Sequence, residues 1–382
     1  MTDPVGEFER VFRRKPECVA SAPGIVNIAG EDSGHDSGLV LALALQQRVR
    51  IAVARRLDRR AYLRSSAVAG EAALALDKLE RTWGWTDPIA GVVAMLEREG
   101  RPAPGFELYV DGTVELGAGL AASAALELAL LAALDGLGGM RLSAAEQAGI
   151  CWRAENEFMG AGEPLTPFLA AVTTREDHAV LVVCHDRTSR VLALEPSEYR
   201  FVTIDAGLHK TASQADAQRI REQCSKALAT AQQGRPEIGR LRDLTQEDIR
   251  GLDEQLRRRC RHVVGEAERT RQAVEALEGG ELGALGKLLT ASHESLRENL
   301  GVEPDELDGL ARLAQTAPGV LGARLPRERN AGCLVALVHE KALTQLDQRV
   351  RTFYATRHGR EARIVAIERA GAGVLVESSG RS

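Results

Sequence analysis

The sequence lacks an excess of positive charge. It has 49 lysine and arginine residues against 54 aspartate and glutamate residues, giving a formal net charge of -5, and both signs are interspersed. A nucleic-acid-binding surface needs a basic stripe that neutralises phosphates, so this composition argues against a nucleic-acid partner. It does not exclude small acidic ligands.

Cysteine spacings typical of metal sites are also absent. The cysteines never fall into a CxxC or Cys/His pattern, which a structural zinc site would need. We therefore expect reduced thiols in a cytoplasmic protein. The six residues are Cys18, Cys151, Cys184, Cys224, Cys260 and Cys333.

An uninterrupted apolar run is missing as well. The most apolar stretch, 116–137, contains Glu127 and Asp135, and no charged-then-apolar leader opens the chain. A membrane-spanning helix needs about 20 consecutive apolar residues. The sequence thus predicts neither a signal peptide nor a membrane partner. Its 382 residues predict two closely packed domains rather than one.

Strand-like and helical patterns alternate along the chain and predict an α+β fold. We place a domain boundary near residue 200, which gives domains 1–198 and 199–382, with a frayed polar tail at 376–382. Strands are expected at 38–55 (two runs), 178–185, 199–207, 332–340 and 363–370. A short polar turn is expected between 178–185 and 199–207. A hairpin is expected at 105–114, with its turn at Asp111-Gly112. Helices are expected at 121–136, 143–159 (opened by a Ser143/Glu146 capping box), 213–233, 243–278, 281–299, 304–316 and 341–357.

The stretch LGAGLAASAALE, 116–127, places a glycine-rich turn before a helix. Such a turn exposes backbone N–H groups together with the positive end of the helix, and both bind phosphate. A GxG taken by itself favours a tight strand-to-helix turn that needs positive φ at Gly117 or Gly119, and its context here favours the phosphate loop. The candidate nucleotide-binding residues are Gly117, Gly119, Leu120, Ser123 and Ala124.

Three ordered stretches resemble motifs of the galactokinases, members of the GHMP small-molecule kinase family. APGIVNIAGED (22–32) is similar to APGRVNLIGEH, LGAGLAASAALE to LGAGLSSSAALE, and RAENEFMG (153–160) to RAENEFVG. The resemblance extends into SHESLRENLGVEPDELD (292–308), which has no obvious catalytic duty. It implies a two-domain GHMP-kinase fold with the ligand cleft between the domains. It also implies ATP and Mg²⁺ as cofactors and phosphoryl transfer to the anomeric hydroxyl of galactose.

The resemblance fails where the family carries its chemistry. The arginine of the opening motif is Ile25, which cannot donate a hydrogen bond from its side chain and is expected to pack in the core. A gapless count from Glu155 puts Pro167 at the catalytic aspartate, and a shift by one residue puts Thr166 there. Neither has a carboxylate to hold a proton. Glu163 is the nearby acid and would need a rebuilt loop to serve.

The sugar-binding run is partly kept. The family's GEHTDYNGG is GEDSGHDSG here, over 30–38. Glu31 is retained, Asp32 replaces the histidine, and Gly34 replaces the aspartate, while Asp36 lies two residues further on. The resemblance therefore makes Glu31, Asp32 and Asp36 the candidate sugar ligands.

The metal equipment is thinner than in the family. Of three successive loop serines only Ser123 remains, after Ala121 and Ala122. Ser123 and the retained Glu155 are the Mg²⁺ candidates that the resemblance implies. Glu155 equally fits a carboxylate on a helix surface or at a helix cap.

The third motif, RMTGGGFGG in the family, is RLPRERNAGC here, over 324–333. Arg327, Glu328 and Arg329 occupy the positions of close backbone approach. They fit either an anion site or a solvated charged turn. Ala217 stands where the family has a sugar-contacting tyrosine.

Loss of a positioned general base typically costs ~10²- to 10⁴-fold in rate. The sequence therefore favours a catalytically inactive or strongly impaired galactokinase-like protein that binds a nucleotide or a monosaccharide, or that regulates a protein partner. An ATP-dependent sugar 1-kinase with a rebuilt site, drawn from Asp32, Asp36, Glu155 or Glu163, stays open. So does a scaffold in which both ligand sites are lost.

Overall fold

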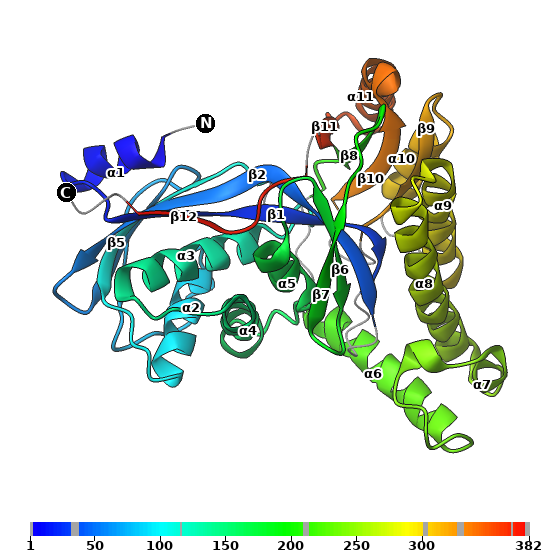
Figure 1. Cartoon of the computed structure of the whole chain (residues 1–382), viewed down its shortest axis with the longest axis horizontal. Coiled ribbons are helices and arrows are strands. Elements are labelled where there is room, and N and C mark those ends of the chain that lie inside the picture. The colour runs from blue at the N-terminus through cyan, green and yellow to red at the C-terminus, as the bar shows by residue number, and fades with distance from the viewer. Residues whose placement is uncertain are drawn as a thin grey trace.

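The protein contains two β-sheets covered by helices (Figure 1). The computed structural model describes residues 3–31, 38–114, 117–208, 214–300, 305–326, 332–367 and 370–378. The larger sheet has the strand order β12-β1-β2-β5-β3-β4, with β6 paired to β2 and β7 paired to β6. The smaller sheet has the order β11-β8-β10-β9. The mixed architecture agrees with the predicted α+β class.

The strands of the larger sheet are β1 (Cys18–Gly30), β2 (Leu39–Arg56), β3 (Arg60–Ser65), β4 (Ala72–Ala75), β5 (Gly105–Gly112), β6 (His178–Val183), β7 (Thr188–Ala193) and β12 (Leu375–Ser378). Those of the smaller sheet are β8 (Tyr199–Asp205), β9 (Val320–Arg324), β10 (Cys333–His339) and β11 (Arg363–Ile367).

Helices cover both sheets. In the larger sheet, α3 and α5 lie on one face and α1 on the other (Figure 1). Helices α9 and α10 contact the smaller sheet, and α8 packs against α9 and against β1 and β2. The α-helices are α1 (Pro4–Phe12), α2 (Asp87–Arg98), α3 (Ala122–Gly138), α4 (Ala144–Arg153), α5 (Thr166–Thr173), α6 (Gln214–Gln232), α7 (Gln246–Arg250), α8 (Glu254–Glu278), α9 (Leu282–Asn299), α10 (Asp305–Gln315) and α11 (Leu343–His358). A π-helix, η1 (Ala154–Phe158), and two 3-10 turns, η2 (Leu241–Asp243) and η3 (Glu340–Ala342), complete the set.

The two strand-like runs predicted over 38–55 form one long strand, β2. Its first part pairs with β6 and its second part with β5, while β1 pairs along nearly its whole length. Pairing with β1 skips residues 45–47 at a register shift and resumes on both sides, so the strand continues past the polar residues where the sequence suggested a break. Two register shifts in this pairing, at Pro23/Ile25 and Asn27/Ala29, fall within the APGIVNIAGED motif.

Several other expectations need correction. The hairpin predicted at 105–114 is the single strand β5, because Asp111 is buried and accepts a 2.7 Å hydrogen bond from the Ser66 hydroxyl instead of turning. The helix predicted at 243–278 is interrupted, since Asp253 caps a new helix, α8. The expected polar turn before residue 199 contains β7, and part of the expected tail forms β12. The capping box at Ser143 and Glu146 is confirmed.

Helix α9 packs directly on β9. A Cβ atom added at Gly322 would lie 1.8 Å from the carbonyl oxygen of Gly286, so only glycine allows this approach. The close packing brings the end of β9, and with it Arg324, beside α8 and α9.

The division into domains 1–198 and 199–382 stays a prediction. β8 begins at Tyr199, and β12 returns from the far end of the sequence to pair with β1. All six cysteines are buried thiols, and the cytoplasmic location inferred from them also stays a prediction. Among the described helices, none has the length and apolarity required to cross a membrane.

Candidate functional site

The glycine-rich loop has the backbone expected of a phosphate-binding turn. Gly117 and Gly119 have φ of 76° and 79°, in the left-handed region that favours glycine. Ala121, the N-cap residue of α3, also has positive φ, and its methyl group cannot cap the first-turn N–H groups. The tight-turn interpretation is thus confirmed. Phosphate binding by Gly117, Gly119, Leu120, Ser123 and Ala124 stays a prediction that this backbone suits.

Strand β1 lies directly behind this loop. The backbone N–H of Ile25 donates a 3.0 Å hydrogen bond to the carbonyl oxygen of Leu120. The Ile25 side chain is only 3% exposed and belongs to the main hydrophobic core. The position that holds an arginine in the family motif is therefore occupied by a packed alkane, as expected.

The third motif reaches the same loop at its end. A Cβ atom added at Gly332 would lie 3.2 Å from the Cα atom of Ala118 and 2.5 Å from the carbonyl oxygen of Leu208. The segment entering β10 thus lies against the glycine-rich loop. Arg327, Glu328 and Arg329 lie outside the described residues.

The two residues that the sequence count assigns to the family's catalytic aspartate lie at a buried helix start, and the assignment itself stays a prediction. Thr166 and Pro167 are the first residues of α5, and both are buried. The Thr166 hydroxyl lies 3.4 Å from the Cys184 thiol. Proline is tolerated in a first helical turn because its missing N–H group would have no partner within the helix. Neither residue brings a carboxylate to this position.

Two buried carboxylates, Glu127 and Glu155, lie close enough to influence each other. Glu155 lies in η1 and is 3% exposed, so it is not a carboxylate on the helix surface. Glu127, on α3, is fully buried. Burial, together with the neighbouring Glu155 and Glu163 carboxylates, raises the pKa of Glu127 well above its ordinary value. The raised pKa favours the neutral form of Glu127, and its signal in the sequence was an acid within an Ala/Leu-rich helix.

Glu163 is fixed through its backbone. Its carbonyl oxygen accepts hydrogen bonds from Trp152 Nε1 at 2.9 Å and from Asn156 Nδ2 at 3.0 Å. Its carboxylate is close enough to Glu127 to raise the pKa of that group. The loop that carries Glu163, which would have to be rebuilt for Glu163 to act as the base, is thus held by hydrogen bonds from Trp152 and from Asn156 of the RAENEFMG motif.

The donor set at the loop suits magnesium held with phosphates. Among the described residues, no group of three or more His, Cys, Asp or Glu side chains is arranged to hold a metal ion. Mg²⁺ is usually bound by one or two carboxylates plus water and phosphate oxygens rather than by an all-protein cage. The Glu155 carboxylate and the Ser123 hydroxyl are donors of the types in that pattern, and their binding of Mg²⁺ beside ATP stays a prediction.

The retained sugar-loop acid, Glu31, directly follows β1. His262 Nε2 lies 3.3 Å from Glu31 Oε2, and His262 Nδ1 lies 3.0 Å from the Ser295 hydroxyl. The Arg324 guanidinium lies 3.6 Å from Glu31 Oε1 and 3.2 Å from Glu266 Oε2. Asp32 and Asp36 fall outside the described residues.

The residues around Glu31 are deeply buried, and the sequence reasoning missed them. His262 and Arg324 are each 1% exposed, and Glu266 is 3% exposed. Burial alone would raise the pKa of Glu266, but Arg324, His262 and Arg269 lower it to about 2. One signal was available: His262, Glu266 and Thr270 are spaced by four, which places them on one helix face.

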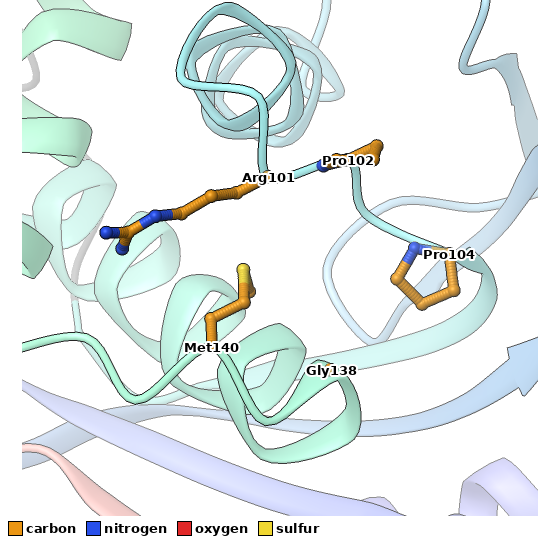
Figure 2. Close-up of a pocket in the computed structure, with 5 residues that line it drawn as sticks. All are labelled: Arg101, Pro102, Pro104, Gly138 and Met140. Carbon is orange, nitrogen blue, oxygen red and sulfur yellow. The ribbon is translucent and has the colours of Figure 1, made fainter.

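A separate pocket lies at the far end of α3. Figure 2 shows Pro102, Pro104 and Met140 around it, with the Arg101 side chain extending away from the prolines. Its volume is about 330 Å³, and Arg101 forms a 3.0 Å ion pair with Glu146. A 17-residue helix is about 25 Å long, so this pocket is distant from the glycine-rich loop at the start of α3.

Comparison with known proteins agrees with the motifs. A family model described as the galactokinase galactose-binding signature matches residues 6–55, and one for the GHMP kinase N-terminal domain matches 87–170. A galactokinase from Roseiflexus sp. (strain RS-1) is 32% identical over 362 residues, which cover 94% of this chain and 92% of that protein. A galactokinase from Thermotoga maritima is 30% identical, covering 88% of this chain and 94% of that protein.

Solved structures show the same relationship. The Lactococcus lactis galactokinase complexed with galactose has a TM-score of 0.90 and 28% identity, covering 97% of this chain and 98% of that one. The Methanococcus jannaschii mevalonate kinase, at 16% identity and a TM-score of 0.62 over 91% of this chain and 96% of that one, shares the fold. From its sequence and its structure alike, this chain belongs to the galactokinase family of GHMP kinases.

Proposed function

We propose that this protein binds a nucleotide and a monosaccharide on a galactokinase framework but transfers phosphoryl groups poorly or not at all. Its role is then that of a ligand-binding or regulatory protein, with a protein partner where it regulates. One observation carries the proposal. Pro167 and Thr166, which the residue count from Glu155 assigns to the family's catalytic aspartate, are buried at the start of α5 and carry no carboxylate.

The nucleotide half of the proposal is supported by the glycine-rich loop. Its glycines hold the conformation that lets backbone N–H groups converge on a phosphate, at the positive end of α3. ATP would bring the phosphates, and Glu155 with Ser123 would hold Mg²⁺ among them.

The sugar half is supported by Glu31. Carboxylates are strong acceptors for the hydroxyl groups of a monosaccharide. Glu31 keeps its place at the end of β1, within the stretch that matches the galactose-binding signature. Asp32 and Asp36 complete the proposed ligand set.

Weak catalysis follows from what positions 25 and 167 now hold. A missing general base costs ~10²- to 10⁴-fold in rate. A missing cation beside the developing charge removes electrostatic stabilisation of a further ~2.7 to 4 kcal/mol, by analogy with a single lost oxyanion donor. The two losses belong to one site and do not simply add.

A sugar 1-kinase with a rebuilt site is the second candidate. It is favoured by the gathering of Glu155 and Glu163 near Glu127, since carboxylates in different environments can divide acid and base roles. A panel of monosaccharides with Mg·ATP tests it. Sugar-dependent ADP release that Glu155→Ala abolishes would support this candidate, and its absence across the panel would exclude it.

Calorimetric titration tests the proposed binding function. We expect saturable binding of Mg·ADP and of galactose, each raising the melting temperature by mass action. Failure of both ligands to bind would contradict the proposal and leave a scaffold without ligand sites. The matched control is Gly119→Val, which should lose nucleotide binding and keep sugar binding, because only the glycine-rich loop is changed.

A further inference from the structure

The Glu31 carboxylate is held by side chains from the second half of the chain. His262 belongs to α8, and Arg324 ends β9. His262 lies 231 positions after Glu31 in the sequence, and Arg324 lies 294 positions after Gly30. Figure 1 shows the end of β1 beside α8 and α9. The orientation of this carboxylate therefore depends on how α8 and β9 are placed.

Each buried carboxylate of this cluster has a cationic partner. Arg324 pairs with Glu31 and with Glu266, and Arg269 pairs with Glu266. Buried ions are tolerated when each is paired and hydrogen-bonded. Arg324 also donates to the backbone carbonyl oxygens of Leu325 and Gly30, which fixes its guanidinium.

The contacts on the two oxygens of Glu31 differ. Oε2 faces His262 Nε2, whereas Oε1 has Arg324 at 3.6 Å and no hydrogen-bond donor among the described residues. A distance of 3.6 Å gives electrostatic attraction without a hydrogen bond. Oε1 is itself buried, so it is an acceptor whose hydrogen-bonding capacity is unsatisfied among the described residues. A ligand hydroxyl would satisfy it.

A ligand cannot reach Glu31 from the side of α8. The cavity there, lined by Glu31, Leu39 and His262 among others, has a volume of about 10 Å³. That space holds about one water molecule and no sugar. His262 consequently acts on a bound sugar only through the carboxylate that it orients.

We infer that His262 and Arg324 are positioning residues that hold Glu31 for a monosaccharide hydroxyl, so that the second half of the chain sets sugar affinity. This inference rests on the proposed sugar-binding function. It adds a role for residues that lie outside the glycine-rich loop and the galactose-binding signature.

Two substitutions at one position separate positioning from stability. The amide nitrogen of glutamine can replace Nε2, which faces Glu31, whereas that of asparagine replaces Nδ1, which faces Ser295. We expect His262→Asn to weaken galactose binding by about tenfold or more and His262→Gln by less than about threefold. Mg·ADP affinity should stay within about twofold in both variants. Arg324→Lys should behave like His262→Asn, because one ammonium cannot replace the fork of donors.

His293→Asn is the matched control. His293 is a second buried histidine, on α9, and its Nε2 lies 3.2 Å from Asp308 rather than from Glu31. It should lower the melting temperature and leave galactose affinity unchanged. Equal galactose affinities of the two His262 variants, or a loss in His293→Asn as large as in His262→Asn, would overturn the inference.

A double-mutant cycle tests the inference without a sugar. Melting temperatures are compared for Glu31→Gln, His262→Asn and the double variant. If His262 holds Glu31, the double variant falls little further than the more damaging single variant. Additive losses would overturn the inference. If the unaltered protein binds no galactose while the cycle is non-additive, the sugar-binding proposal fails and the coupling of His262 to Glu31 stands.

Discussion

At the residue scale, the two positions that the sequence comparison assigns to the family's arginine and catalytic aspartate hold residues with structural roles. Ile25 is packed in the main core, and Pro167 opens a buried helix. A side chain that has been absorbed into packing cannot be exchanged for a charged one without cost, because the surrounding groups offer no ready partner for the charge. Substituting the family's residue types at these two positions is therefore not expected to rebuild the family's catalytic site.

We predict that Ile25→Arg destabilises the protein and does not restore activity. The guanidinium would enter a position that is 3% exposed, at a cost of about 2 to 4 kcal/mol in the free energy of unfolding. Ile25→Val, the control, should cost about 0.5 to 1.5 kcal/mol. Urea unfolding measures both. An Arg variant as stable as the Val variant would mean that position 25 opens to solvent.

A second residue-scale prediction concerns Glu127. Its folded-state pKa is raised, so the folded protein binds this proton more tightly than the unfolded chain, and stability falls as pH rises above about 4.5. Glu127→Gln keeps the shape of the neutral carboxyl and removes this dependence. The variant should gain stability relative to the unaltered protein between pH 5 and pH 8, measured by urea unfolding. If the difference in free energy of unfolding between the two proteins did not change with pH, the pKa of Glu127 would not be raised in the folded protein.

At the element scale, locally encoded features were predictable. The capping box of α4 and the apolar run of α3 rest on spacings within a few residues, and both helices are confirmed. β5, β7 and β12 depend on remote partners. Asp111 and Gly112 pair with β2 instead of forming the predicted turn. The partner of β12 is β1, at the other end of the sequence. Local propensity cannot report such pairings.

The glycine-rich loop offers a matched pair of substitutions. Gly119→Ala forces a Cβ atom into a residue with φ of 79°, at a cost of about 1 to 2 kcal/mol. Ala121→Gly removes the same penalty from a residue with φ of 58° and should be neutral or stabilising by up to about 1 kcal/mol. Thermal unfolding measures both changes, and Mg·ADP titration should show weaker binding for Gly119→Ala. If Gly119→Ala stabilised the protein and Ala121→Gly destabilised it, the loop would have a backbone conformation other than the one described.

At the scale of the whole molecule, one buried cluster joins the two sheets. Glu31 follows β1, Arg324 ends β9, and His262 and Glu266 lie on α8. The motifs near Glu31 and the glycine-rich loop could be located from the sequence because each is contiguous. The cluster could not, because its members meet only after the chain has folded. The local signal of the cluster in the sequence was the four-residue spacing of His262, Glu266 and Thr270 on α8.

The cluster predicts how acid unfolds the protein. The pKa of Glu266 is lowered from 4.5 to about 2, so its ion pairs stabilise the fold above pH 4.5 and that contribution is lost as pH falls toward 2. Glu266→Gln should be least stable relative to the unaltered protein at pH 7, and the gap should narrow by up to about 3 kcal/mol toward pH 2. Urea unfolding at each pH measures the gap.

Glu157→Gln is the control for that experiment. Glu157 is about half exposed and pairs with Arg98 on the surface. Such pairs contribute about 0 to 1 kcal/mol, so this variant should follow the unaltered protein at every pH. A gap for Glu266→Gln that does not change with pH would show that Glu266 is not ionised in the folded protein.

The most direct test of impaired phosphoryl transfer is galactose-dependent ADP release from Mg·ATP, measured beside the Lactococcus lactis galactokinase under identical conditions. We expect a rate at least about 100-fold lower than that of the relative, because the positions assigned to the base and to the neighbouring cation hold Pro167 and Ile25. A rate within about tenfold of the relative's would contradict the account, and it would mean that the carboxylates near Glu155 have taken over the chemistry.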